Sequence, residues 1–407
     1  YDYLGEHEVK NIAKPVRVYR AQIEPEAVPS KLVKEKRPVG KRLSKTALAI
    51  IAVVVIAGAV ILYQFVLRPS ASKTEVASKE KMAFPLPDRP SIAVLPFANM
   101  SDDPKQEYFS DGITEEIITA LSKVPNLFVI ARNSTFTFKG KPVMVKQVSE
   151  QLGVRYVVEG GVRWKGERVR ITVQLIDALS GHHLWAERYD RDLKDIFVLQ
   201  DEIAMKIITA LQVKLTAGEM VHVMAKGARN LDAFIKFLQA LDLYEKETKE
   251  GNARARKLIE EAIALDPEYP RLYMTLALTH IMDVWLGMTE SPGHSLDRAF
   301  DLARKAISLD DSNASAYSVL GYVYAMKKQY DKAIAECKRG VLLDPNSADN
   351  FLRLAVAHNW AGRAEEAIPY IQNAIRLNPL PSAEYYIPLV VAYRDSGQYD
   401  KAIETAK

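Results

Sequence analysis

An unbroken apolar run divides the chain into two parts. Residues 46–67, TALAIIAVVVIAGAVILYQFVL, contain no charged side chain over 22 positions. As an α-helix this segment would be about 33 Å long, which is enough to cross the hydrocarbon core of a bilayer. A surface helix of a soluble domain keeps a polar stripe, and this segment has none. The pattern therefore predicts one transmembrane helix.

The segment 91–215 mixes the periods of strands and helices. Glycine-containing turns at 165–167 and 179–181 predict two hairpins. The order βαβαβββα predicts an α/β domain in which helices pack on a mixed sheet. The expected strands are 91–97, 127–131, 155–164, 168–177 and 182–189, and the expected helices run from Asp111 to about Lys123, over 145–152 with Gly153 at its end, and over 196–215.

From Leu231 onward the chain repeats. Leu-Asp-Pro or a variant of it recurs at 265–267, 309–311, 343–345 and 377–379. The last two steps are 34 residues long, the period of tetratricopeptide (TPR) repeats. The first step is 44 residues, which predicts an insertion of ten, placed in an extra loop near Met288–Ser295. We expect four and a half repeats over 231–407, the last one cut at Lys407.

Small residues at fixed places, such as Gly321, Ala333 and Gly340, let the two helices of a repeat cross closely. A single repeat cannot bury its apolar face, so the repeats are expected to stack into an all-α solenoid. The inner surface of such a solenoid binds a protein or a peptide. First-helix residues that point away from the packing face are predicted to line this groove: Tyr322, Met326, Asp349, Leu352, Asn359, Trp360, Ile387 and Arg394.

Charge predicts the orientation of the apolar run. A Pro- and Lys-rich linker precedes it at 23–45 and a second polar linker follows at 68–90. Within the first, the stretch 31–45 holds seven basic residues against one Glu. The positive-inside bias places the N-terminus in the cytoplasm and residues 68–407 outside, in the periplasm beyond a single-pass inner or plasma membrane. The net charge of +4 comes mostly from this cluster, so composition gives no case for nucleic-acid binding.

The chain offers little that suggests catalysis. It contains no G-x-x-x-x-G-K-[ST] and no G-x-G-x-x-G motif. His182 and His183 are adjacent on a predicted strand and would point to opposite faces, so they would not hold one metal together. The lone Cys337 has the spacing of a small core residue. We therefore expect no catalytic, cofactor or metal residues within this sequence, and whether the parent protein is an enzyme stays open.

Residues 1–22 resemble the end of a known catalytic domain. Leu4–Lys10, Ile12–Val16 and Val18–Arg20 look like the last hairpin of class III adenylate/guanylate cyclases, which often close with LGEHxLKGIxxPVxVYRV. The resemblance implies an upstream cyclase domain that uses Mg²⁺ and ATP and pairs as a dimer. The catalytic residues of that family lie upstream of this hairpin, and none can be placed here. On this reading the chain is the C-terminal part of a cyclase.

A second resemblance covers about 120 residues. Segments of 91–215 are similar to the TolB-like N-terminal domain that occurs beside cyclase and TPR modules. The resemblance implies an extracytoplasmic binding or sensing module, and the family has no known chemistry to carry over. The segments that carry it are Ser91–Phe97, Phe109–Ile113, Val157–Arg163, Val169–Asp177 and His183–Asp190.

These features favour one function and leave others open. The chain is expected to be the non-catalytic sensory and protein-interaction region of a membrane-anchored class III adenylate cyclase-like signalling protein, anchored by residues 46–67. The alternative is a membrane-anchored TPR scaffold, or a transmembrane transcription regulator, without cyclase activity. A soluble enzyme centred on 91–215 is least supported, because the search for motifs found none.

Overall fold

The computed structural model describes residues 2–7, 16–20, 76–215 and 227–407. The chain divides into two compact units, Tyr1–Lys73 and Thr74–Lys407. In the first unit, β1 (Asp2–His7) and β2 (Val16–Arg20) pair antiparallel, with a register irregularity between Tyr3 and Gly5. The predicted terminal hairpin is therefore present as a pair of strands.

The predicted transmembrane segment, 46–67, lies outside the described residues, as does the basic linker 23–45. In the part of the chain that the structure describes, no helix combines the length and the apolar character needed to span a bilayer. The membrane anchor therefore stays a prediction from the sequence.

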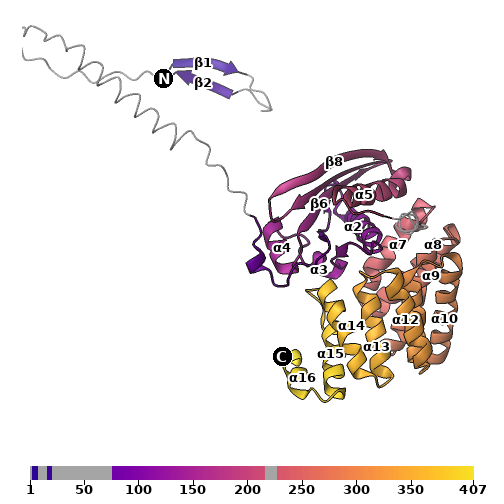
Figure 1. The fold of residues 1–407 in the computed structure, drawn as a ribbon. Coiled ribbons are helices and arrows are strands. Elements are labelled where there is room, and N and C mark those ends of the chain that lie inside the picture. Colours follow the sequence, from indigo (N-terminus) through magenta and orange to yellow (C-terminus); the bar gives the residue numbers. More distant parts are fainter. Residues whose placement is uncertain (1, 8–15, 21–75, 216–226) are drawn as a thin grey trace, which may run out of the picture. The chain divides into compact units, whose positions relative to one another are not determined.

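The second unit begins with a six-stranded sheet (Figure 1). Its strand order is β5-β3-β6-β7-β8, and the short β4 adds to β6. Parallel pairing joins β3 to β5 and β6, whereas β6, β7 and β8 form an antiparallel meander, so the predicted mixed sheet is confirmed. The strands are β3 (Ser91–Val94), β4 (Ala98–Asn99), β5 (Phe128–Val129), β6 (Tyr156–Lys165), β7 (Arg168–Asp177) and β8 (His182–Asp192).

Apolar alternation explains how this sheet packs. Val169, Ile171 and Val173 are buried at every second position of β7, so one face of the sheet joins the core. Gly153 adopts a left-handed conformation with φ of 62° and ends α4, as predicted. The helices of this domain are α2 (Glu107–Ser122), α3 (Arg132–Phe136), α4 (Val145–Leu152) and α5 (Ile196–Ala210).

The predicted start of the first helix was wrong. Asp111 was expected to cap a helix, but α2 begins at Glu107, one turn earlier, and Asp111 lies inside it. The cause is the preceding 3-10 turn, in which the Asp103 carboxylate accepts a hydrogen bond from the Lys105 amide and leads straight into α2. The last helix was also predicted too long, because α5 ends at Ala210 and not near residue 215.

The predicted linker 68–90 is not a free tether over its described part. The Ala77 amide donates to the Ala178 carbonyl and the Ala83 amide to the Glu150 carbonyl, each at 2.8 Å. Residues 76–90 therefore run along the α/β domain as a strap, and we use that name for them below. Its low hydrophobicity suggested a linker, but its backbone hydrogen bonds bind it to the domain.

Ten helices follow between Leu231 and Ala406 and form antiparallel pairs of sequence neighbours (Figure 1). They confirm the predicted solenoid, and the fifth pair ends in a helix of only eight residues. The helices are α7 (Leu231–Tyr244), α8 (Lys249–Leu265), α9 (Pro270–Trp285), α10 (Pro292–Leu309), α11 (Ala314–Met326), α12 (Tyr330–Leu343), α13 (Ala348–Trp360), α14 (Ala364–Leu377), α15 (Ala383–Asp395) and α16 (Tyr399–Ala406).

The ten-residue insertion is mostly helical and not the loop expected near Met288–Ser295. Compared with the following pair, α9 is three residues longer and α10 four residues longer, and the turn between them gains three. Pro292 starts α10 because a proline at the first helical position needs no hydrogen-bond partner for its nitrogen. The insertion therefore lengthens the second repeat along its helix axes.

One core crosses the boundary between the two predicted domains. A continuous cluster of buried side chains runs from Ile92 in the sheet through Ile203 in α5 to Leu276 in α9. A second cluster joins Ile130 and Val157 of the α/β domain to Leu377 and Tyr385 of the helical array. Segments 91–215 and 231–407 are thus two secondary-structure arrangements within one packed body.

We predict that Gly321→Ala destabilises the protein by about 2 kcal/mol, because overpacking a tight helix crossing forces backbone shifts. A Cβ at this position would lie 2.5 Å from the Cys337 sulfur and 2.8 Å from the Ala333 carbonyl oxygen. The measurement is the free energy of unfolding from denaturant titration. Gly293→Ala is the matched control, since its Cβ would meet nothing within 4 Å. Equal stability of the two variants would contradict this packing.

Candidate functional site

The turns between repeats dock on the α/β domain. The Asn346 side-chain amide donates to the Ser122 carbonyl at 2.8 Å and to the Val124 carbonyl at 3.2 Å. The Ser122 hydroxyl in turn donates to the Asp344 carboxylate at 2.9 Å. One repeat later, the Ala131 amide donates to the Leu377 carbonyl at 2.8 Å. The Leu-Asp-Pro turns that recur every 34 residues therefore also contact the α/β domain.

A cluster of mostly buried charges lies where α9 meets α2. Arg271 donates to the Glu115 carboxylate at 2.9 Å and also pairs with Glu116. Its guanidinium lies over the Phe237 ring, 4.9 Å from the centroid. Burial raises the pKa of Glu116, and burial lowers the pKa of the nearby Lys123. Glu115 and Glu116 of α2 therefore bind the helical array.

The strap also contacts the helical array, through Arg376 of α14. Arg376 of α14 donates to the Gly153 carbonyl at 2.9 Å and to the Pro85 carbonyl at 3.1 Å. Its guanidinium also lies 4.5 Å from the centroid of the Phe128 ring and 5.2 Å from that of Phe84. One side chain of the array therefore holds the strap, β5 and the end of α4 together.

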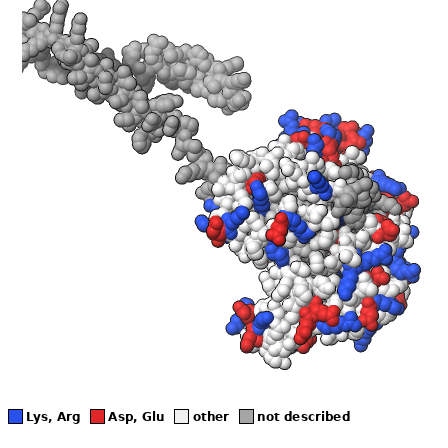
Figure 2. All heavy atoms as spheres, in the orientation of Figure 1, with Lys and Arg blue, Asp and Glu red and all other residues white. Residues whose placement is uncertain are grey.

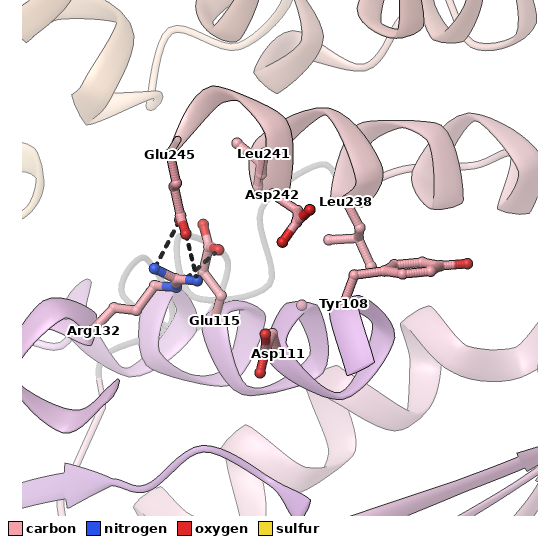
Figure 3. A pocket seen from close by; sticks show the side chains of 9 residues that line it. Tyr108, Asp111, Glu115, Arg132, Leu238, Leu241, Asp242 and Glu245 are labelled. Carbon is pink, nitrogen blue, oxygen red and sulfur yellow. Dashed lines mark hydrogen bonds and ion pairs between the residues drawn. The ribbon is translucent and has the colours of Figure 1, made fainter. Parts of the chain in front are cut away.

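A shallow hollow lies between α2 and α7 (Figure 3). Arg132 sits between two of its carboxylates, 2.7 Å from Glu245 and 3.5 Å from Glu115. Lys139 neutralises a third, Asp111, whose pKa is raised by burial. These pairings make the hollow part of the joint between the domains. The residues lining it are Tyr108, Asp111, Gly112, Glu115, Arg132, Leu238, Leu241, Asp242 and Glu245.

Three aromatic side chains on the first helices of successive repeats form a row. Tyr322 of α11 stacks on Trp285 at the end of α9, with ring centroids 6.5 Å apart and planes within 2°. On its other side Tyr322 stacks on Trp360 at the end of α13, with centroids 5.7 Å apart. Trp285 is 59% exposed and Trp360 38%. We call these three residues the aromatic row. It spans three successive repeats, and its two tryptophans are exposed to solvent.

Two of the predicted groove residues hold neighbouring helices together. Asp349 accepts a hydrogen bond from the Tyr385 hydroxyl at 2.5 Å. The Asn359 side-chain amide donates to the Pro388 carbonyl at 2.9 Å. Both contacts link α13 to α15, so these polar groups are already used inside the array.

The other predicted groove residues fall into three groups. Tyr322 and Trp360 belong to the aromatic row, and Ile387 of α15 is 61% exposed. Met326 and Leu352 are half-buried against core clusters. Arg394 is exposed and pairs with its neighbour Asp395 at 2.7 Å. The eight positions therefore do not act as one surface, and their role in binding stays a prediction.

Sequence reasoning missed Trp285 and Arg353. Trp285 lies in the extra turn of α9, beyond the thirteen residues that the period assigns to a first helix, so counting positions could not find it. Arg353 of α13 acts electrostatically on Tyr244 of α7 and on Glu384 of α15. Burial raises the pKa of Tyr244 to about 12 and the pKa of Glu384 above its usual range. A cation thus lies among carboxylates and phenols close to the aromatic row.

The described residues contain no group of three or more His, Cys, Asp or Glu side chains that could hold a metal. His182 and His183 are both exposed on β8. Burial raises the pKa of the Cys337 thiol to about 12, which keeps it protonated and unreactive as a nucleophile.

Comparison with protein families gives two matches. Residues 88–226 match the model described as HilA/YgeH-like transcriptional regulator, second domain. Residues 302–335 match a tetratricopeptide repeat, which confirms the predicted repeat family. The similarity of 91–215 to TolB-like domains stays a prediction.

Two curated relatives cover larger parts of the chain. A Rhizobium meliloti (strain 1021) protein named "Putative adenylate cyclase 3" is 44% identical over 251 residues, which are 61% of this chain and 42% of that protein. The Salmonella typhimurium protein "Transcriptional regulator HilA" is 22% identical over 320 residues, which are 77% of this chain and 55% of that protein. The chain thus spans about half the length of the curated relatives it matches. Among solved structures, the crystal structure of MamA is 24% identical, with a TM-score of 0.30, over 40% of this chain and 89% of that one.

We predict that Arg271→Met destabilises the protein by about 3 kcal/mol, because it leaves Glu116 without its ion-pair partner, and Glu115 with Arg132 alone, at a mostly buried joint. Denaturant unfolding followed by tryptophan fluorescence measures the change. Arg229→Met is the matched control: its ion pair with Glu268 is exposed, with 67% and 64% of the two side chains accessible. A surface pair of this kind contributes about 0–1 kcal/mol. If both variants lose the same stability, the joint does not depend on Arg271.

Proposed function

We propose that the Thr74–Lys407 unit is the non-catalytic, protein-binding and sensory region of a membrane-anchored, cyclase-like signalling protein. The observation that carries the binding part is the exposed aromatic row on the first helices of a TPR array. Rigid aromatic rings with polar neighbours supply large contact area at low entropic cost, which is what peptide-binding surfaces use. The occupant we propose is an extended protein segment.

The cyclase part rests on two independent supports. The relative from Rhizobium meliloti is named as an adenylate cyclase and is 44% identical over 251 residues. The hairpin β1–β2 has the position and sequence pattern expected of the end of a class III cyclase domain. On this proposal the missing catalytic domain binds Mg²⁺ and ATP and pairs as a dimer, residues 46–67 cross the membrane, and 68–407 face the periplasm as a TolB-like and TPR sensor.

A specific observation favours the alternative, a membrane-anchored transcription regulator. The matched family model describes the second domain of HilA/YgeH-like regulators, and the HilA match extends over 77% of this chain. The same α/β and helical unit would then serve a DNA-binding domain in place of a cyclase. Both proposals assign one role to this unit, which is to bind a partner and pass that state to another domain.

We predict that Trp360→Ala weakens peptide binding at least tenfold, because truncating a central aromatic anchor removes about 1.4 kcal/mol or more of contact. A library of fluorescein-labelled ten-residue peptides is first screened against the unsubstituted chain, and the best binder is titrated by fluorescence anisotropy. Tyr399→Ala is the matched control, since Tyr399 lies on α16 and is 64% exposed. Unchanged affinity in Trp360→Ala would remove the aromatic row from the binding surface.

We predict that deleting residues 91–407 from the intact parent protein changes its cyclic-nucleotide output several-fold. Output rises if the unbound unit inhibits the cyclase and falls if the unbound unit activates it. Output is measured by immunoassay on membranes with equal amounts of each protein. The Trp360→Ala variant serves as the folded comparison. Measurable output that is identical with and without 91–407 would rule out regulation by this unit. No output from the intact protein would favour the transcription regulator.

A further inference from the structure

The sheet of the α/β domain ends in a long strand with an open edge. β8 spans eleven residues, His182–Asp192, and pairs only with β7 among the described strands. Figure 1 places it as the outermost strand of the sheet. An open edge of this length is a template for a further strand, and proteins normally shorten, cover or twist it away. β8 is longer than any other strand that the structure describes.

The register on β7 shows which residues point their backbone outward. The Leu193 amide donates to the Glu167 carbonyl at 2.7 Å, next to the pair Arg168 and Asp192. Antiparallel pairs alternate between hydrogen-bonded and non-hydrogen-bonded, so Glu187, Tyr189 and Arg191 bond to β7. The residues between them direct their amides and carbonyls away from the sheet: Ala186, Arg188, Asp190 and Asp192.

Charges along this edge are arranged symmetrically around Tyr189. The sequence 187–191 is Glu-Arg-Tyr-Asp-Arg. When a second copy lies antiparallel with Tyr189 on the two-fold axis, each Arg188 faces an Asp190 and each Glu187 faces an Arg191. Opposite charges across two strands stabilise by about 0.2–1 kcal/mol per pair. The two-fold axis repeats each of these pairs, so the gain is counted twice.

Neighbouring registers are less complementary. Only shifts of two residues keep outward-facing backbone groups opposite each other. A shift in one direction brings Arg188 against Arg188 of the second copy. A shift in the other direction brings Asp190 against Asp190 and keeps only the two contacts between Arg188 and Asp192, in place of four opposite-charge contacts. Like charges directly opposite each other are destabilising. The charges therefore select one register and favour an identical strand as the partner.

The groups needed for this contact are accessible. Within one chain, Asp190 pairs with Arg170 at 2.7 Å and with Arg188 at 3.7 Å, and their side chains are 37–66% exposed. Exposed pairs of this kind are worth little and can exchange partners. Next to the edge, Val198 of α5 is 70% exposed, one helical turn before Glu202, which pairs with Arg191 of β8. Figure 2 shows acidic and basic side chains interleaved where Figure 1 places β8.

We propose that β8 pairs antiparallel with β8 of a second copy of this chain around Tyr189, which joins two sheets into one. This contact is separate from the inner face of the helical array and does not depend on what binds there. It also differs from any pairing through a cyclase domain. The interface is made of backbone hydrogen bonds and four cross-strand charge contacts. Because of the two-fold axis these contacts are of two kinds, Arg188 with Asp190 and Glu187 with Arg191.

Two opposite charge reversals test this pairing. Arg188→Asp gives a chain with two acidic residues at 188 and 190, and Asp190→Arg gives a chain with two basic ones. Each variant alone places like charges opposite each other and should dimerise about tenfold more weakly by analytical ultracentrifugation, since about 1.4 kcal/mol is lost. Mixed together, the two variants regain opposite charges, and dimers of one acidic and one basic chain should form.

The mixture gives a readout that other contacts between copies cannot imitate. The two full-length variants carry different affinity tags and are mixed in equal amounts in detergent. Dimers of one acidic and one basic chain should make up clearly more than half of all dimers, the share expected from random pairing. If the dimer is held by the apolar run or by another surface, that share would stay at one half. Arg363→Asp, whose pair with Asp331 lies on the array, is the control and should dimerise like the unsubstituted chain. A monomeric unsubstituted chain, or mixing at the statistical half, would overturn the proposal.

Discussion

A mostly buried guanidinium at the joint between the α/β domain and the helical array is the constraint on which the unit depends. Arg271 of α9 sits between Glu115 and Glu116 of α2, in surroundings where an unpaired charge is costly. Because α2 also packs on the sheet, this one cluster fixes the first repeats relative to β3 and β6. The inter-repeat turns at Asn346 and Leu377 extend the joint along the array. The sheet domain therefore contacts several successive repeats and fixes their position relative to the sheet.

Local periodicity was enough to predict most elements. The TPR pairs could be found because each helix packs mainly on its sequence neighbours, so the 34-residue spacing already encodes the contacts. The joint could not be found this way. Ser122 and Asn346 are 224 residues apart, and nothing in either local pattern signals the other. The start of α2 was missed for a smaller reason, since the turn capped by Asp103 continues into the helix.

Counting positions within the 34-residue repeat predicted which helix a residue lies on better than it predicted which contacts its side chain makes. It placed Tyr322 and Trp360 correctly on first helices, but it could not tell that Asn359 would bond to the Pro388 carbonyl. Trp285 escaped because the insertion lengthened α9. In a repeat with an insertion, the position of a residue in the 34-residue period therefore does not predict which residues line a groove, and a structure is needed.

The strap has a mechanical consequence. It is hydrogen-bonded to the α/β domain through Ala77 and Ala83, and Arg89 reaches both the Pro125 carbonyl and Asn346 of the array. Arg376 holds it from the array side through Pro85. Tension or torque entering the body at residue 76 is consequently shared by both architectures. Because the strap is bound to both parts, a change in the angle between the sheet domain and the helical array would displace residue 76, where the strap begins.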